Sequence, residues 1–391
     1  MKIDRGNPWH WLWLGMFTLN TLAALLLRWF GWRRDPGSVV LYGHKLNGNL
    51  AALLAQARRE ADPAMTLSFL TMDPAYCREL RAAGELAVLA ISPRCIPLLA
   101  RAGALVTDHG LHCLSLLVRL GGLPAFDVWH GIPFKGFDAD DFRVQHRYEE
   151  TWLPSPRVER LYVERFGFDP ARLVATGYAR TDALVRGDEP QEALLARLDL
   201  TATQGKKRVL FAPTWKQDAA GRSVFPFGLA ADEFFAGLDA VCARTGAVAL
   251  FRSHLNSTDV ATVDGGRIVA VPHADVPDTE GVLLASDVLV CDWSSIAFDW
   301  LLLERPTIFL DVPPPFAKGF SLGPEYRYGE IVDSFERLLE RLEAYLRDPE
   351  TYAAAHGARA AAVREEIYGP FADGRSALRC LERLRERALR S

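Results

Sequence analysis

The spacing of hydrophobic residues changes repeatedly along this chain. Short continuous apolar runs alternate with segments whose hydrophobic residues recur every three or four positions, as in amphipathic helices. Short apolar runs rich in β-branched residues are typical of buried strands, and the segments between them predict helices. Regular alternation of the two predicts a parallel sheet with helices on both faces. The strands predicted in the first series are 38–42, 66–71, 86–91, 104–107, a strand that ends at Val128-Trp129, and 172–176.

A second series of the same kind begins after Gly205-Lys206-Lys207. Its predicted strands are 208–212, 247–251, 268–271, 288–291 and 307–310, and its predicted helices are 231–245, 295–303, 335–346 and 376–389. Two such series predict an α/β protein with two Rossmann-like domains, at 35–200 and 201–391, the second ending in the C-terminal helices. Ligands of such sheets bind at the carboxyl ends of the strands, so we expect the active site in the cleft between the domains.

The first 34 residues break this pattern and predict a membrane helix over 1–34. No charged residue occurs from Gly6 to Leu27, and half of the ten tryptophans lie in the first 32 residues, at both ends of the apolar stretch. A helix of about 20 residues spans a bilayer core of about 30 Å, and tryptophans at both ends are typical of membrane interfaces. We expect a chain that begins near Asp35 to be soluble and to keep its activity.

Two other interpretations of this N-terminal stretch remain. The polar residues His10, Asn20 and Thr21 would suit a helix that lies in the interface rather than one that spans it. A signal peptide is disfavoured, because the residues from Trp29 to Arg34 make a poor cleavage site. More arginines follow the stretch than precede it, which places the rest of the chain on the cytoplasmic side.

Composition excludes several functions. The net charge of −4 and the pI near 6.2 argue against a nucleic-acid partner. The six cysteines form no C-x-x-C pair, which indicates buried reduced thiols. No Gly-x-Gly-x-x-Gly run and no Walker-type loop opens either series, so we predict no dinucleotide or other cofactor.

Four segments place polar side chains directly after predicted strands. Their candidates are a histidine able to act as a base and several groups able to hold phosphate. Each also has a structural alternative, such as a histidine held in a turn or a serine that caps a helix. The candidates are His130 and Lys135, then Thr214, then Arg252 and His254, then Ser294 and Ser295.

A fifth segment, Asp108-His109-Gly110-Leu111-His112, also follows a strand. Two histidines three residues apart are more often local hydrogen-bonding residues than metal ligands, and no acidic pair stands near the other candidates. We therefore predict no metal site. Asp108 and His109 remain candidates for the side of the site that meets the acceptor.

The motifs resemble those of one family, in order from about Ser38 to the C-terminus. The run Trp129-His130-Gly131-Ile132-Pro133-Phe134-Lys135 resembles the W-H-G-T-P-x-K segment of the CDP-glycerol glycerophosphotransferase family, which makes teichoic-acid and capsule-like polymers. Further matching segments are Ala212-Pro213-Thr214-Trp215, Arg252-Ser253-His254, Ser286-Asp287-Val288 with Asp292-Trp293-Ser294-Ser295, and Asp373-Gly374-Arg375-Ser376.

This resemblance implies a fold, a reaction and roles for residues. The fold would be the two-domain GT-B arrangement, with His130 as catalytic base and His254, Ser294 and Ser295 holding the donor diphosphate. Position alone adds Lys135, Thr214 and Arg252 to the donor side. The reaction would transfer an alditol phosphate, with glycerol phosphate as first choice, from a CDP-alditol to a hydroxyl of a lipid-linked or surface-polymer acceptor, releasing CMP. The enzyme would work without a metal at the cytoplasmic face of the cell membrane.

Three other functions fit the alternating pattern less well. The first is a GT-B glycosyltransferase that uses a nucleotide sugar, since it shares the fold and the need for a diphosphate site. The second is an enzyme like the UDP-sugar 2-epimerases, which would need catalytic carboxylates. The third is a membrane-anchored binding protein, for which paired histidines would have no purpose.

Overall fold

The structure, a computed structural model, describes residues 6–214, 225–252, 266–273 and 275–388. The chain folds into two compact units. Unit 1 comprises Met1–His130, Asp138–Asp182 and Arg375–Ser391, and unit 2 comprises Gly131–Phe137 and Ala183–Gly374. The chain therefore passes between the units at four points rather than once.

Unit 1 is built on a seven-stranded sheet in the order β3-β2-β1-β4-β5-β6-β7, with every pairing parallel. The order reverses between β1 and β4, and such a switch point is where parallel sheets bind ligands. The strands are β1 (Asp35–Tyr42), β2 (Thr66–Thr71), β3 (Ala87–Leu89), β4 (Ala102–Thr107), β5 (Ala125–Asp127), β6 (Glu150–Leu153) and β7 (Leu173–Ala175).

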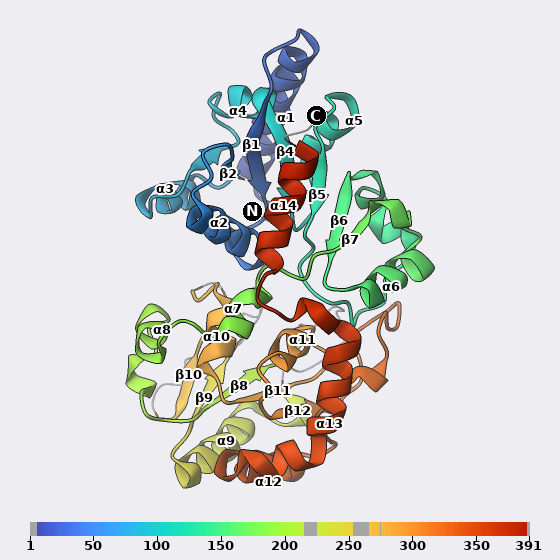
Figure 1. Ribbon diagram of the computed structural model, residues 1–391. Helices are drawn as coiled ribbons and strands as arrows, with labels where there is room; N and C mark the ends of the chain where they lie inside the picture. The colour runs from blue at the N-terminus through green and yellow to red at the C-terminus, as the bar shows by residue number, and fades with distance from the viewer. Residues whose placement is uncertain (1–5, 215–224, 253–265, 274, 389–391) are drawn as a thin grey trace. The chain divides into compact units, whose positions relative to one another are not determined.

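Helices cover both faces of this sheet, and in Figure 1 α14 lies in front of it and α1 behind. One apolar cluster joins α1, α4 and α5 to the sheet, and another joins α2, α3 and α14 to its other face. The helices are α1 (Pro8–Trp29), α2 (Gly48–Glu60), α3 (Pro74–Ala82), α4 (Cys95–Arg101), α5 (Ser115–Leu120), α6 (Pro156–Phe166) and α14 (Ser376–Ala388). Helix α7 (Thr181–Arg186) begins in unit 1 and continues into unit 2.

Helix α1 is part of unit 1 and packs along the sheet. Its buried residues recur every three or four positions and form one stripe: Phe17, Thr21, Ala24, Leu25 and Arg28. The Asn20 side chain also donates to the carbonyls of Ala90 and Ser92, at 3.0 and 3.2 Å. In the described part of the chain it is the one helix long and apolar enough to cross a membrane. The separate membrane segment expected over 1–34 is thus a helix with one face in the core of unit 1.

Unit 2 has a six-stranded sheet in the order β10-β9-β8-β11-β12-β13, again all parallel. The strands are β8 (Arg208–Ala212), β9 (Val248–Phe251), β10 (Ile268–Ala270), β11 (Val288–Cys291), β12 (Thr307–Leu310) and β13 (Glu330–Val332). The helices are α8 (Gln191–Arg197), α9 (Ala231–Thr245), α10 (Thr279–Ala285), α11 (Ile296–Leu301), α12 (Phe335–Arg347) and α13 (Pro349–Ile367).

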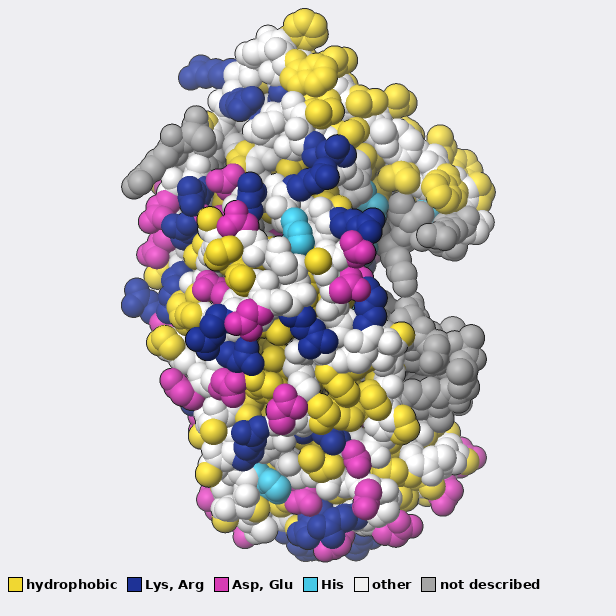
Figure 2. All heavy atoms as spheres, turned by 90° about the vertical axis from the view of Figure 1, so that its right-hand side faces the viewer, with side chains coloured by type: hydrophobic (Ala, Val, Ile, Leu, Met, Phe, Trp, Pro, Cys, Tyr) yellow, Lys and Arg dark blue, Asp and Glu magenta, His cyan; other side chains and the backbone are white. Residues whose placement is uncertain are grey.

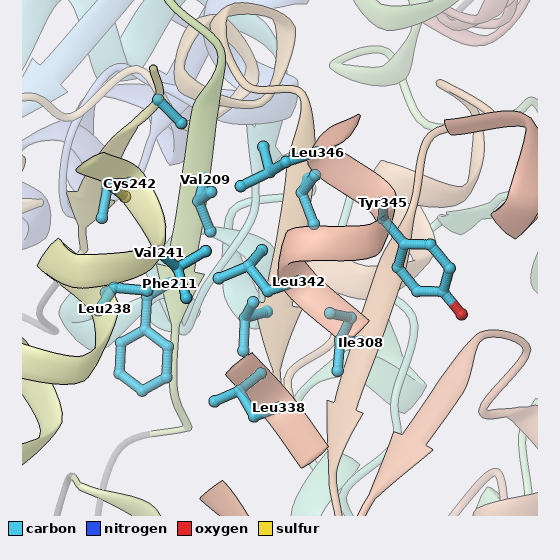
Figure 3. Packing of buried hydrophobic residues seen from close by; sticks show 14 of the residues in the cluster. Val209, Phe211, Leu238, Val241, Cys242, Ile308, Leu338, Leu342, Tyr345 and Leu346 are labelled. Atoms are coloured by element: carbon cyan, nitrogen blue, oxygen red, sulfur yellow. The ribbon is translucent and has the colours of Figure 1, made fainter. Parts of the chain in front are cut away.

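The core of unit 2 forms where α9 and α12 pack on one face of the sheet (Figure 3). Helix α12 places its buried residues at Leu338, Leu342, Tyr345 and Leu346, the spacing of a single apolar stripe. These side chains meet the strand residue Ile308, which is fully buried. The two parallel α/β series expected from the sequence are therefore confirmed.

The compact units differ from the domain boundaries expected at residue 200. Helix α14 was expected in the C-terminal domain, but its apolar residues Cys380, Leu381 and Leu384 belong to the core of unit 1. The Asp182 carboxylate accepts hydrogen bonds from the backbone N–H groups of residues 376 and 377, both at 2.8 Å, and so caps α14. Residues 183–200 belong to unit 2.

Candidate active site

Three loops at the carboxyl ends of neighbouring strands bring three histidines together in unit 1. His44 follows β1, His109 follows β4 and His130 follows β5. The ring centroids of His44 and His109 are 4.5 Å apart. The rings of His109 and His130 are stacked, with centroids 4.8 Å apart and planes 11° apart. The structure thus brings the candidate base His130 against the candidate acceptor-side residue His109.

The hydrogen bonding of His130 fixes which ring nitrogen is basic. Its Nδ1 lies 3.1 Å from the backbone carbonyl of Asp108, and a carbonyl can only accept. Nδ1 therefore carries the proton, and Nε2 carries the lone pair. The residue as a whole is exposed. The protein packed around the ring nevertheless removes hydration, and this desolvation, with the charge of His109, lowers the pKa of His130.

The pKa of His109 is shifted in the opposite direction. Its Nδ1 lies 2.7 Å from Oδ1 of Asp108, whose carboxylate is buried. Burial alone would lower the pKa of His109, but the hydrogen bond and the negative charge of Asp108 outweigh it and raise the pKa. Two stacked titratable groups whose pKa values move apart are a common arrangement for a base and a neighbouring cation.

The backbone before His130 is strained and held by buried polar groups. Trp129 has a φ of +43°, which a residue with a large side chain rarely adopts. Its N–H donates to Oδ1 of Asp127 at 2.9 Å, and its carbonyl accepts from Nδ2 of Asn49 at 2.9 Å. Arg180 donates to the His130 carbonyl at 2.6 Å. These contacts fix the direction in which the His130 ring leaves the sheet.

Sequence reasoning missed His44, Asn49 and Arg180. The first two were available from the sequence in outline, because a glycine-rich loop directly follows the first predicted strand. His44 lies in this loop, and Asn49 lies at the start of α2 behind it. That loop is tight: a Cβ at Gly43 would lie 2.6 Å from Oδ1 of Asp108. Arg180 carries no local signal, since it reaches His130 from a distant part of the chain.

Immediately after His130 the chain enters unit 2. The Phe134 carbonyl accepts from the N–H of Ser321 at 2.8 Å, and the Phe134 ring packs 4.7 Å from the ring of Phe298. The predicted donor residue Lys135 is half-buried and forms an antiparallel bridge with Phe320. Lys135 therefore belongs to the same unit as the other predicted donor residues.

Thr214 and Asp292 join the carboxyl ends of β8 and β11. The backbone N–H of Thr214 donates to Oδ1 of Asp292 at 2.7 Å, and the Thr214 hydroxyl donates to the same oxygen. Asp292 is buried and also accepts from the N–H of Trp293 at 2.7 Å. The structure thus gives the Thr214 hydroxyl an internal partner, and its contact with a donor stays a prediction.

Ser294 and Ser295 lie where β11 turns into α11, as the sequence predicts. The Ser294 side chain accepts weakly from the N–H of Ile296 at 3.4 Å, and Ser295 occupies the N-cap position without a capping side-chain bond. Both residues are half-buried. Ser294 therefore has some of the capping character that was the alternative to phosphate binding, whereas Ser295 has no such contact.

Arg252 is directed into unit 2 rather than outward. Its guanidinium donates to the Val276 carbonyl at 3.1 Å and the Thr279 hydroxyl at 2.9 Å, and lies 3.0 Å from Nδ1 of His273. Burial lowers the pKa of Arg252 to about 10. The residue holds the segment between β10 and α10 in place. The second residue of this predicted pair, His254, lies outside the described residues.

Metal ligands were not expected, and no group of three or more His, Cys, Asp or Glu side chains in the described ranges is arranged to hold an ion.

Comparisons with known proteins support the family resemblance. The sequence profile of the CDP-Glycerol:Poly(glycerophosphate) glycerophosphotransferase family matches residues 35–386. The teichoic acid ribitol-phosphate polymerase TarL of Staphylococcus aureus is 28% identical over 268 residues, which are 63% of this chain and 46% of that protein. A teichoic acid poly(glycerol phosphate) polymerase of Staphylococcus epidermidis is 27% identical over 46% of this chain and 28% of its own length. The chain spans about half or less of these relatives.

The fold has a close counterpart among solved structures. The wall teichoic acid polymerase TagF superimposes with a TM-score of 0.74 at 17% identity, covering 97% of this chain and 94% of that one. This likeness confirms the GT-B-like fold with two parallel sheets.

Proposed function

Because the chain belongs to the CDP-glycerol:poly(glycerophosphate) glycerophosphotransferase family, we propose that it transfers an alditol phosphate from a CDP-alditol to an acceptor hydroxyl. Glycerol phosphate is the first choice of group. The family description names it, and one relative is described as a poly(glycerol phosphate) polymerase. Ribitol phosphate is the second, since TarL is described as a ribitol-phosphate polymerase.

The proposed reaction is one displacement at phosphorus. The acceptor oxygen attacks the β-phosphorus of the CDP-alditol, and a new P–O ester bond forms. The bond from that phosphorus to the oxygen bridging the two phosphates breaks, and CMP leaves with the bonding electrons. The proton of the acceptor hydroxyl passes to Nε2 of His130.

The stacked rings of His130 and His109, with pKa values shifted in opposite directions, are the observation that carries this proposal. A neutral His130 with its proton on Nδ1 presents a lone pair at Nε2. A protonated His109, stacked on it and paired with Asp108, supplies positive charge for the phosphate oxygens. Neither role would be needed in a turn that was only structural.

We assign the donor to groups of unit 2, following the motif order. Ser295 and Lys135 are the candidates whose side chains make no hydrogen bond to another residue in the part of the chain that the structure describes. Ser294 and His254 complete the set by resemblance. Thr214 and Arg252 support it by holding the strand ends and the β10–α10 segment.

The remaining assignments concern the membrane. The outward face of α1 carries exposed Trp9, Trp11, Leu12, Leu19 and Leu26. A helix with one face packed on a protein and an apolar opposite face suits the membrane interface better than a span. We therefore propose that unit 1 rests on the cytoplasmic face of the membrane and takes a lipid-linked acceptor there.

The test compares donors and variants in one assay of nucleotide release. The full chain is incubated with CDP-glycerol, CDP-ribitol and UDP-sugars, and we expect CMP release from a CDP-alditol and no UDP release. His130→Ala and His130→Asn should both lose about 10²–10⁴-fold in rate while binding the donor as before. His146→Asn, elsewhere in unit 1, is the matched control.

Two results would contradict the proposal. Release of UDP from a nucleotide sugar would favour the glycosyltransferase alternative. A His130→Asn variant that keeps its rate would show that His130 only holds its turn, and His109 would become the next candidate base.

A further inference from the structure

A cavity in the wall of unit 1 lies away from the histidines. It has a volume of about 710 Å³ and is bordered by Pro36, Ala102 and Pro124, at the starts of β1, β4 and β5. The histidines follow the opposite, carboxyl ends of the same strands. This cavity is therefore separate from the candidate active site and needs its own explanation.

Arginine side chains dominate its wall. Five line it, on α1, on the loops before β1 and β6, and on α14: Arg28, Arg34, Arg147, Arg383 and Arg387. Glu149 and Glu386 also line it. The buried Glu150, which pairs with Arg383 and Arg387, adds a third carboxylate. Positive charge remains in excess.

Arg28 is the clearest example of a positive charge in this wall that has no paired carboxylate. It is buried, and its guanidinium donates to the backbone carbonyls of Gly121 and Ala102, both at 2.8 Å, with weaker bonds to three more. No carboxylate among the described residues pairs with it. Burial, together with the nearby charge of Arg34, lowers the pKa of Arg28 to about 10. An anion in the cavity would relieve this repulsion.

Arg34 and Arg147 are the groups best placed to receive such an anion. Both are exposed, and neither side chain has a hydrogen bond or ion pair within the described part of the chain. The Arg34 guanidinium lies near the backbone of Gly122 at the cavity wall, 3.7 Å from where a Cβ would stand. A guanidinium presents paired donors that match phosphate oxygens.

Exposed apolar and aromatic side chains, here called the aromatic rim, adjoin the cavity residues Arg28, Arg34 and Gly122 along the chain. Trp29, Phe30, Trp32 and Leu120 are all exposed, with Phe30 at 86%. The Trp29 indole donates to the Leu120 carbonyl at 2.9 Å, which joins the end of α1 to α5. Figure 2 shows hydrophobic side chains gathered at the top of this face of unit 1, with Lys and Arg side chains beside them. Tryptophans next to basic groups are typical of protein surfaces at the headgroup level.

We propose that this cavity binds the phosphate headgroup of an anionic membrane phospholipid, while the aromatic rim enters the acyl region beside it. The ligand is assigned to a lipid rather than to a free anion because the basic wall is continuous with the apolar face of α1. The site would seat unit 1 on the membrane at the amino ends of its strands, leaving the histidines at their carboxyl ends unobstructed.

The first experiment measures flotation of the full chain with vesicles of phosphatidylcholine, with or without one third phosphatidylglycerol. We expect tighter binding to the anionic vesicles. The double variant Arg34→Gln/Arg147→Gln should weaken that binding on the order of 30-fold, because each arginine near a charged membrane contributes about 1 kcal/mol. Binding to neutral vesicles should change little.

The matched control is Arg78→Gln/Arg160→Gln, which removes two exposed arginines of unit 1 that lie outside the cavity. It should bind anionic vesicles within about twofold of the unchanged chain. Equal losses in both double variants would overturn the proposal, since binding would then follow net charge. Melting temperatures of all variants identify any that fail to fold. Arg34→Lys/Arg147→Lys then serves as the replacement, with a smaller loss expected.

A second arm separates the lipid from free phosphate. Calorimetry with dihexanoyl-phosphatidylglycerol below its micelle concentration should show binding that the Arg34/Arg147 variant loses. Inorganic phosphate should bind at least tenfold more weakly. Equal affinity for both would overturn the lipid assignment and leave only an anion site. Donor turnover is not the readout, so these results stand apart from the proposed transferase activity.

Discussion

The pKa shifts of His130 and His109 favour opposite protonation states at the same pH. The lowered pKa of His130 means that its neutral, basic form persists as pH falls below 6.5, the ordinary value for histidine. The raised pKa of His109 means that its cation persists as pH rises above that value. If the first acts as base and the second as cation, both are in their working forms around pH 6.5.

We therefore expect kcat/KM for CMP release to be bell-shaped, with an acid limb below pH 6.5 and a basic limb above it. His109→Gln should lower the rate and remove the basic limb while keeping the acid one. The measurement is initial rate against pH at subsaturating donor. An acid limb centred above 6.5, or a basic limb that survives in His109→Gln, would contradict these roles.

Asn49 acts through the turn that carries His130. Asn49→Ala removes donors to two buried carbonyls and an acceptor for the Arg180 N–H, and each unsatisfied group costs about 1–3 kcal/mol. We expect a lower free energy of unfolding, and a fall in kcat without change in donor affinity. Urea unfolding and calorimetry measure both, with Gln56→Ala on the same helix as control. A variant as active as the unchanged chain would show that the turn holds itself.

The sequence could predict single site residues at strand ends, but not which other side chains lie beside them. His130 and Ser294 follow strands whose apolar runs are easy to recognise. The cluster of His44, His109 and His130 depends on β1, β4 and β5 lying side by side, which no local pattern determines. The inward direction of Arg252 likewise depends on a loop more than 20 residues away.

At the scale of elements, α14 shows how a helix can be predicted and its partner missed. Its periodicity predicts 376–389, and the structure has Ser376–Ala388. Chain order alone would add it to the second α/β series. Its stripe of Cys380, Leu381 and Leu384 instead completes the core of unit 1, where α14 packs beside α2 on the same face of the sheet.

The cap that joins α7 to α14 gives a prediction at this scale. Asp182→Ala removes a buried carboxylate that accepts hydrogen bonds from the first two backbone N–H groups of α14. We expect the free energy of unfolding to fall by about 1–3 kcal/mol, and Asp182→Asn to lose less because an amide oxygen still accepts. Urea unfolding measures this, with the exposed Asp188→Ala as control. An equal, small loss in all three would mean that α14 needs no cap.

At the scale of the whole molecule, the packing of α1 changes how its membrane role can be tested. Removal of residues before Asp35 was expected to leave a soluble, active enzyme. It would also remove Phe17, Leu25 and Arg28, uncover their partners on α4 and α5, and expose part of the sheet face that α1 covers. A truncated chain that aggregated would then say nothing about membranes, so the outward face must be changed by itself.

Three exposed leucines of α1 allow that test: Leu12, Leu19 and Leu26. None belongs to the core of unit 1, so replacing all three with glutamine should leave the melting temperature and donor turnover unchanged. A helix in the membrane interface is held by its buried apolar area, and full burial of one leucine contributes about 1.5–3 kcal/mol. We therefore expect the unchanged chain to sediment with membranes and to need detergent for release, and the triple variant to appear in the soluble fraction.

The control replaces three exposed apolar residues elsewhere, Leu86, Val144 and Ile331, and should stay with the membrane. An unchanged chain that remains soluble without detergent would refute the membrane assignment, and a triple variant that still sediments would favour a span over an interfacial helix.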